Sequence, residues 1–163
     1  MIVCNTSPIY YLHKIGRLQI LHSLFAEISI PVAVVRELDE GKRLGYNAPD
    51  VRDYSWIKQH SVNIPEELNS LGIGSGETEA IALALQNSVK VVLLDDGEAR
   101  RAALERKLPV MGTVGVLATS VRKGLLPQLV ESLDQLASEG FRLSEAIRER
   151  ALRSVGEILP PST

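Results

Sequence analysis

The sequence predicts a three-layer α/β/α domain with a central, mainly parallel sheet. The first observation is that short apolar segments alternate with longer amphipathic ones, which is typical of strands connected through helices. The second is the segment Val89–Leu94, which is apolar except for Lys90 and resembles the central strand of a parallel sheet. The third is the length, because 163 residues suffice for one domain with a sizeable core.

Short apolar runs that end at turn residues predict the strands. We expect three of them, Ile2–Cys4, Val89–Leu94 and Pro109–Met111, to lie parallel in one sheet. Glu27–Ile30 is a further expected strand. Residues 42–75 contain scattered Gly, Asn, Pro and Ser, and there we expect only a short helix near Asp50 and a strand around residues 56–57.

Apolar residues at helical spacing, together with terminal signals, predict the helices. Ser7 is the expected N-cap of the first helix, with Pro8 at its first helical position, and Gly41 is expected to end the third. The expected helices span residues 7–14, 17–25, 31–41, 77–86, 98–107, 116–123, 128–137 and 144–155. We expect a single domain over residues 1–155 and a frayed tail over residues 156–163.

Composition excludes several classes of protein. Lys and Arg number 18 against 20 Asp and Glu, a net charge of −2, which excludes a uniformly basic protein that coats nucleic acid. Cys4 is the only cysteine, so the chain has no internal disulfide framework and no CxxC site. No apolar run approaches the ~20 residues that span a bilayer. The first residues lack the features of a signal peptide, so we expect a cytoplasmic protein.

Charge is distributed unevenly along the chain. Residues 37–98 carry 12 acids against 5 bases, whereas residues 99–124 carry six bases and one acid. The pattern indicates an acidic site with a basic border, and the alternative is that these charges only solvate helix faces.

The ends of the expected strands carry polar residues. In open parallel sheets, ligands bind outside the carboxyl ends of the strands. This rule selects Asn5 after the first strand, Asp95 and Asp96 after the central one, and Thr113 after the last. Two adjacent carboxylates at such a place can hold Mg²⁺ or Mn²⁺. The alternative is that Asp96 is a helix N-cap and Asp95 a solvated neighbour.

Two further acids lie in helices. Glu77 follows three glycines at a helix start, with Glu79 as a second candidate, and the alternative role of Glu77 is to interact with the helix dipole. Glu37 lies beside an apolar helix stripe and could equally be a surface acid. Cys4 ends an apolar strand, so we interpret it as a small buried residue rather than a nucleophile.

Five segments occur in an order that resembles the PIN-domain ribonucleases. They are Asn5-Thr-Ser-Pro, Glu37 in Val-Val-Arg-Glu-Leu, Gly76-Glu-Thr-Glu-Ala-Ile-Ala-Leu-Ala, Leu93-Leu-Asp-Asp-Gly-Glu-Ala-Arg and Gly112-Thr-Val-Gly-Val-Leu. More narrowly, the chain is similar over residues 1–155 to a PIN subfamily of uncharacterised function, often set beside VapC-like toxin–antitoxin nucleases.

This resemblance implies a metal-dependent endoribonuclease that hydrolyses RNA phosphodiesters with Mg²⁺ or Mn²⁺, with an antitoxin protein as a partner if the protein is a toxin. It also implies a homodimer, with residues 17–25 and the C-terminal helices as interface elements. The implied metal ligands are Asn5, Glu37, Glu77, Asp95 and Asp96, of which the four acids would be catalytic. A hydroxyl group normally joins the pocket, and the candidates are Thr6, Ser7 and Thr113. Candidates for RNA-backbone contacts are Arg100, Arg101 and Lys123, which could instead be solvated cations.

The chain departs from the family pattern at position 5, where Asn5 stands in place of an aspartate. An amide oxygen can still face a cation, but it carries no negative charge. The alternative function is therefore a catalytically weakened PIN module that binds RNA or a protein partner. A small phosphatase is disfavoured, because no Asp-x-Asp motif follows the first strand.

Overall fold

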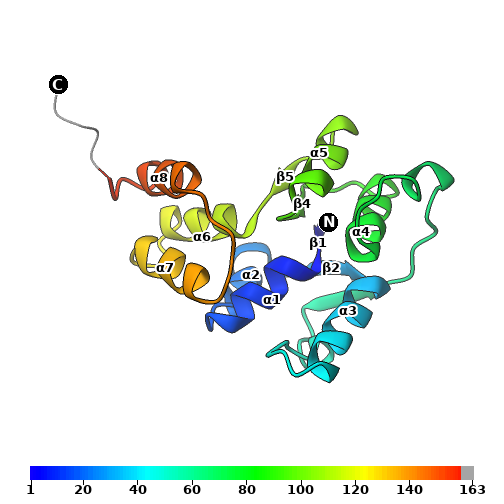
Figure 1. Cartoon of the computed structure of the whole chain (residues 1–163), viewed down its shortest axis with the longest axis horizontal. Coiled ribbons are helices and arrows are strands. Elements are labelled where there is room, and N and C mark those ends of the chain that lie inside the picture. The colour runs from blue at the N-terminus through cyan, green and yellow to red at the C-terminus, as the bar shows by residue number, and fades with distance from the viewer. Residues whose placement is uncertain (159–163) are drawn as a thin grey trace.

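A computed structural model of the chain describes residues 1–158, and it contains a five-stranded sheet in the order β3-β2-β1-β4-β5 (Figure 1). Every pair of neighbouring strands is parallel, as the sequence predicts. The strands are β1 (Ile2–Cys4), β2 (Ile28–Pro31), β3 (Ile57–His60), β4 (Val91–Leu93) and β5 (Val110–Met111).

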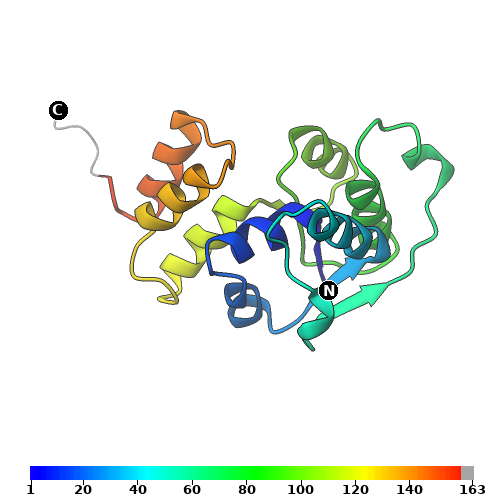
Figure 2. The same cartoon turned by 60° about the horizontal axis from the view of Figure 1, so that its bottom comes forward.

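The described part of the chain also contains eight helices. They are α1 (Thr6–Lys14), α2 (Gln19–Phe25), α3 (Val32–Arg43), α4 (Ser75–Leu85), α5 (Gly97–Glu105), α6 (Thr113–Arg122), α7 (Val130–Ser138) and α8 (Glu145–Ser154). The short helix expected near Asp50 is a single 3₁₀ turn, Val51–Asp53, and a second one spans Glu66–Leu68. In both views of the ribbon, α6, α7 and α8 gather at one end of the molecule and α3, α4 and α5 lie toward the other (Figures 1 and 2).

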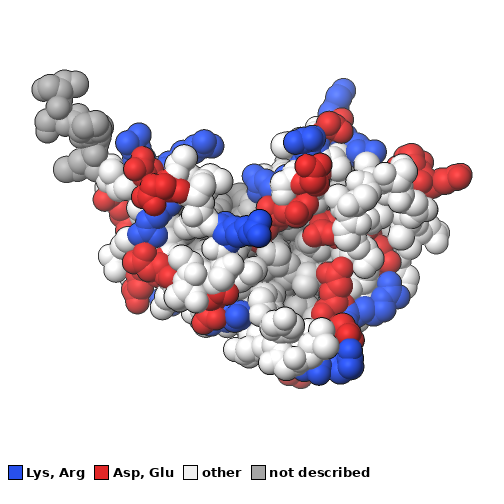
Figure 3. Space-filling view, viewed as in Figure 1, with Lys and Arg blue, Asp and Glu red and all other residues white. Residues whose placement is uncertain are grey.

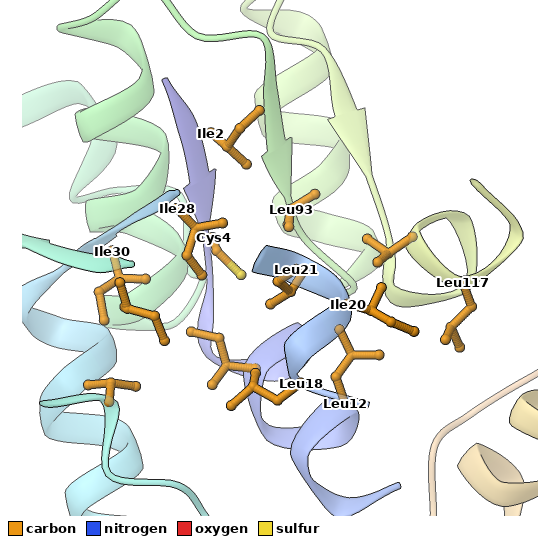
Figure 4. Close-up of a cluster of buried hydrophobic side chains, with 14 of the residues drawn as sticks. Ile2, Cys4, Leu12, Leu18, Ile20, Leu21, Ile28, Ile30, Leu93 and Leu117 are labelled. Atoms are coloured by element: carbon orange, nitrogen blue, oxygen red, sulfur yellow. The ribbon is translucent and has the colours of Figure 1, made fainter. Parts of the chain in front are cut away.

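The pleat of the sheet divides the core into two layers. Cys4 and Leu93 face the larger core, which they share with residues of α1, α2, α3 and the three C-terminal helices (Figure 4). Val3, Val92 and Leu94 face the smaller core beneath α4 and α5. Because successive strand residues point to opposite faces, one apolar run supplies both cores. The three-layer α/β/α architecture follows from this arrangement.

The boundaries of two helices differ from those that the sequence predicts. Helix α1 begins at Thr6, so Ser7 lies in its first turn and is not the N-cap. Helix α3 does not end at Gly41 but continues to Arg43, where Arg43 also pairs with Glu40. One glycine within a helix costs only about 1 kcal/mol, and the helix ends where Gly45 adopts φ 92°.

Helices α4 and α6 begin earlier than expected, because glycines that suggest turns lie inside their first turns. Gly76 follows Ser75, the first residue of α4, and Gly115 lies near the start of α6. A side chain at Gly115 would come within 2.8 Å of the Met111 side chain, so the absent side chain allows close packing. The central strand β4 is shorter than the apolar run at 89–94.

The end of the described chain is tied to α7. The carboxylate of Glu157 accepts hydrogen bonds from the backbone N–H groups of Leu129, at 2.7 and 2.9 Å, and of Val130, at 3.3 Å. Glu157, which falls in the expected tail, is therefore held by hydrogen bonds, and residues 159–163 lie outside the described part of the chain. Within residues 1–158, no helix combines the length and apolar character that crossing a membrane requires.

Leu93→Ala is expected to lower the free energy of unfolding by about 2–5 kcal/mol, because Leu93 is fully buried in β4 and its loss leaves a cavity. Urea unfolding followed by circular dichroism measures the change. Leu104→Ala is the matched control on α5, where the side chain is 57% exposed, and it should change stability by less than about 0.5 kcal/mol. Equal losses in the two variants would contradict the assigned core.

Candidate metal centre

The strand order places the candidate site between β1 and β4. From β1 the chain proceeds to β2 on one side, whereas β4 lies on the other side, so the direction of winding changes between β1 and β4. Open α/β sheets bind ligands at such a point. Asn5 follows β1, and its backbone N–H donates to the Leu93 carbonyl of β4 at 3.1 Å. Asp95 and Asp96 follow β4, so these three residues come to one edge of the sheet.

The carboxylate of Glu37 joins three helices at this edge. It accepts hydrogen bonds from the Thr6 hydroxyl of α1, from the Ser75 hydroxyl at 3.3 Å and from the Gly76 backbone N–H at 2.8 Å. The charge of Glu37 therefore lies at the N-terminus of α4, where the helix dipole favours an anion. This placement explains why an acid on a mainly apolar helix face turns inward.

Gly76 leaves room for the oxygen atoms of the site. A side chain on Gly76 would lie 2.6 and 2.7 Å from the carboxylate oxygens of Glu37 and 2.8 Å from Oδ1 of Asn5. The Glu37 carboxylate and the Asn5 amide oxygen therefore converge on the space that a side chain of Gly76 would occupy. Oδ1 of Asn5 is buried, and no hydrogen-bond partner for it exists within residues 1–158. A buried acceptor without a partner costs free energy, which a bound donor or cation would recover.

Glu77 brings a second carboxylate to the same place. Burial raises the pKa of the Glu77 carboxyl above its usual value, and the negative charges of Glu37 and Asp96 raise it further. A favourable contact with the Asn5 side chain opposes this rise. The Glu77 carboxylate therefore senses the negative charges of Glu37 and Asp96.

Asp95 and Asp96 have different surroundings. The carboxylate of Asp95 accepts hydrogen bonds from the Ser7 hydroxyl at 2.7 Å, the Thr113 N–H at 2.7 Å and the Thr113 hydroxyl at 2.6 Å. It thus connects α1 to the start of α6 and is not merely a solvated neighbour of Asp96. Asp96 is exposed and caps α5 through the N–H of Ala99 at 3.0 Å, as the capping interpretation predicts.

The three candidate hydroxyl groups all contact a carboxylate. Thr6 donates to Glu37, while Ser7 and Thr113 donate to Asp95. They orient these carboxylates, and each hydroxyl donates its one hydrogen to the carboxylate that it contacts.

Two other polar or reactive residues have structural surroundings. Glu79 is buried and accepts from the Ala33 N–H at 2.9 Å and from Arg36 at 3.2 Å, so it stabilises the start of α3. Cys4 is fully buried, and burial together with the charge of Asp95 raises the pKa of its thiol. A thiol in these surroundings is a poor nucleophile.

The three basic residues proposed to contact the RNA backbone lie in different surroundings. Arg100 donates to the Leu94 carbonyl at 3.0 Å and lines a cavity beside Asp95. Arg101 is exposed and pairs with Glu98 at 3.8 Å, and Lys123 is exposed at the end of α6. Neither Arg101 nor Lys123 lines the cavity.

The same cavity contains three arginines that sequence analysis did not select. Arg122, Arg142 and Arg150 line it together with Arg100. The one sequence signal that could have found Arg142 and Arg150 is the high arginine content of residues 142–153. In the space-filling view, acidic side chains lie along one side of a central hollow and basic side chains appear at its opposite rim (Figure 3).

A comparison with family models finds that one described as a PIN domain matches residues 1–157. The chain belongs to the PIN-domain family. This result confirms the resemblance and identifies the chain as a PIN domain of uncharacterised function. PIN domains are generally nucleases. Searches of curated proteins and of solved structures found no match to this chain.

The donor atoms of this PIN domain suit a hard divalent cation. Carboxylate and amide oxygens are the ligands that Mg²⁺ and Mn²⁺ prefer, and the buried oxygen of Asn5 lacks a partner within residues 1–158. In the same part of the chain, no three Asp, Glu, His or Cys side chains lie close enough to form a ready metal site. Binding would therefore require the Glu77 and Asp96 side chains to move toward Asn5 and Glu37.

Gly76→Ala is expected to disrupt the centre, because the added methyl group would displace Glu37 or Asn5. Such overpacking costs about 1–3 kcal/mol of stability, and it should also remove any rise in melting temperature on addition of Mn²⁺. Gly97→Ala is the matched control, since a side chain at Gly97 meets nothing within 4 Å. A Gly76→Ala protein that is as stable as the parent and responds equally to Mn²⁺ would contradict the geometry.

Glu77→Gln is expected to raise the melting temperature of the metal-free PIN domain at pH 7. The pKa of Glu77 is raised in the folded state, so the stability that this group contributes is present below its unfolded pKa of about 4.3 and is lost as the pH rises through the higher folded value. The gain should therefore disappear near pH 4. Thermal unfolding in EDTA at both pH values measures it.

Glu27→Gln is the control for this pH dependence, because Glu27 is exposed at the amino end of β2, away from the centre. It should change the melting temperature little at either pH. A gain from Glu77→Gln that is the same at pH 4 and pH 7 would show that charge repulsion is not its cause.

Proposed function

We propose that this PIN domain is a metal-dependent endoribonuclease that hydrolyses RNA phosphodiesters with Mg²⁺ or Mn²⁺. The observation that carries the proposal is the buried oxygen of Asn5, which has no partner among the described residues and lies with the Glu37 carboxylate in the space left by the absent side chain of Gly76. The neighbouring carboxylates of Glu77 and Asp96 add negative charge at the same edge of the sheet. Family membership supports a nucleic acid as the substrate.

In this proposal Asn5, Glu37, Glu77 and Asp96 hold the cation. When bound, a divalent cation stabilises the charge that develops on the phosphate and favours ionisation of the attacking water. Thr6 and the start of α4 orient Glu37, while Asp95 is fixed by Ser7 and Thr113. Asp95 thereby positions the start of α6 beside the centre.

The biological setting is part of the same proposal. A cytoplasmic location belongs to it, and a role as the toxin of a toxin–antitoxin pair and a homodimer formed through α2 and the C-terminal helices rest on the family resemblance. The family match itself supports only the nuclease-type fold.

A second candidate function is a weakened PIN module that binds RNA or a protein partner. Two observations favour it. Asn5 carries no charge where the family has aspartate, and hydrogen-bond donors already occupy the carboxylates of Glu37 and Asp95. A cation would have to compete with these donors.

Cleavage of an unstructured RNA in Mn²⁺ distinguishes the two functions. The protein with Asn5 is expected to cleave weakly. Asn5→Asp should raise Mn²⁺ affinity and the cleavage rate together, the rate by at least about tenfold, since each 1.36 kcal/mol gained by the transition state is a factor of ten. Glu77→Gln in the Asn5→Asp background should abolish both.

Asn63→Asp controls for the change in net charge, because Asn63 is exposed and lies before α4, outside the centre. It should leave cleavage unchanged. Strong cleavage by the parent protein without a gain from Asn5→Asp would reject the view that Asn5 weakens the site. Absence of cleavage in both proteins would favour the binding module.

A further inference from the structure

We infer that the cavity beside Asp95 is a subsite that holds one nucleotide of the RNA strand next to the carboxylate centre. We call it the arginine cavity and define it by Arg100, Arg122, Arg142 and Arg150. This inference rests on the proposed function, because it states where a neighbouring part of the substrate would lie. It adds a site that involves α8 and the segment before it, which carry none of the carboxylates of the centre.

The size of the arginine cavity suits a nucleotide. It measures about 450 Å³ and lies between β5, α6 and α8. Small-molecule sites in proteins commonly enclose about 300–1,000 Å³. The space-filling view shows a hollow on the surface with basic side chains at its rim (Figure 3).

The charge of the cavity suits a phosphate group. Its four arginines face one carboxylate, that of Asp95. Arg122 donates to the hydroxyls of Ser154 and Thr119, at 3.2 and 3.1 Å, so its guanidinium is held between α8 and α6. Arg142 and Arg150 form no ion pair with any residue in 1–158. Guanidinium groups without a carboxylate partner are suited to bind phosphate through paired hydrogen bonds.

Part of the lining of the cavity is apolar and suits a base. Met111, Phe141 and Ile147 line it, and Ile147 is 48% exposed although it is a large apolar side chain. The ring of Phe141 packs edge-on against Tyr11, with centroids 5.0 Å apart and planes at 89°, which fixes its orientation. Inorganic phosphate would gain nothing from this surface, whereas a nucleobase packs on aromatic and apolar side chains.

Gly112 joins the arginine cavity to Asp95, which lies beside the carboxylate centre. A side chain on Gly112 would lie 2.9 Å from Nη1 of Arg100 and 3.1 Å from Oδ1 of Asp95. The basic and acidic parts therefore meet at one backbone position. A strand whose phosphodiester lies at the carboxylates can place an adjacent nucleotide among the arginines, and this continuity favours RNA over an acidic protein segment as the occupant.

Binding of small probes to the full chain in EDTA tests the inference without any cleavage. Isothermal titration calorimetry with the four ribonucleoside 5′-monophosphates should show affinities at least about tenfold higher than with inorganic phosphate. Arg150→Ala should weaken nucleotide binding by roughly tenfold, the factor that corresponds to one lost charge-assisted contact. Ile147→Ser should weaken nucleotide binding and leave phosphate binding unchanged.

Arg153→Ala is the matched control on the same helix. Arg153 pairs with Glu149 at 3.9 Å and does not line the cavity, so its loss should change the affinity by less than about twofold. Thermal unfolding checks that each variant is folded, and exposed Arg150 is not needed for the core.

Three results would overturn the inference. Inorganic phosphate could bind as tightly as the nucleotides, Arg150→Ala and Arg153→Ala could weaken binding equally, or a peptide of Asp, Glu and Leu could bind there without competition from nucleotides. The last result would identify a protein partner. Nucleotide binding without cleavage in the Asn5→Asp protein would reject the proposed nuclease activity and support the subsite. Cleavage without nucleotide binding would support the nuclease activity and reject the subsite.

Discussion

The carboxylate of Glu37 is the contact on which the acidic edge of this PIN domain depends. It lies where α1, α3 and α4 converge, and donors from Thr6, Ser75 and Gly76 surround it. An ionised acid in such a partly buried place is stable because hydrogen bonds and the start of a helix compensate for lost water. The approach of α4 in turn requires Gly76 to be a glycine, so one missing side chain sets the distance between Glu37 and Asn5.

The acids at this edge divide into two kinds. Glu37 and Asp95 are held by donors from several helices, and they fix the geometry even without a ligand. Asp96 is exposed and only caps α5, while Glu77 has a raised pKa caused by burial and by the neighbouring negative charges. In the proposed metal site, Glu37 and Asp95 would form the fixed frame, and Glu77 and Asp96 would adjust to the cation.

Much of the fold was predictable from sequence, because β1 and β4 are apolar on both faces and the helices that follow have clear amphipathic patterns. The acids at strand ends were predictable for the same reason. The tertiary contacts were not predictable. In the sequence Glu37 resembles a surface acid, and only the fold brings the start of α4 beside it. Likewise Arg142 and Arg150 gain significance only because α8 packs on α6, far from β4 in sequence.

The strand order also governs how the chain can assemble. β1 pairs with β2 through Val3 and Ser29, but its other edge pairs with β4, where Val3 meets Val92. During synthesis, which proceeds from the N-terminus, that second edge of the innermost strand stays open until β4 emerges. An open apolar edge is prone to pair with other chains, and contacts this distant in sequence form slowly. Until more than half of the protein has been made, the nascent chain therefore lacks the acidic centre and exposes one unpaired strand edge.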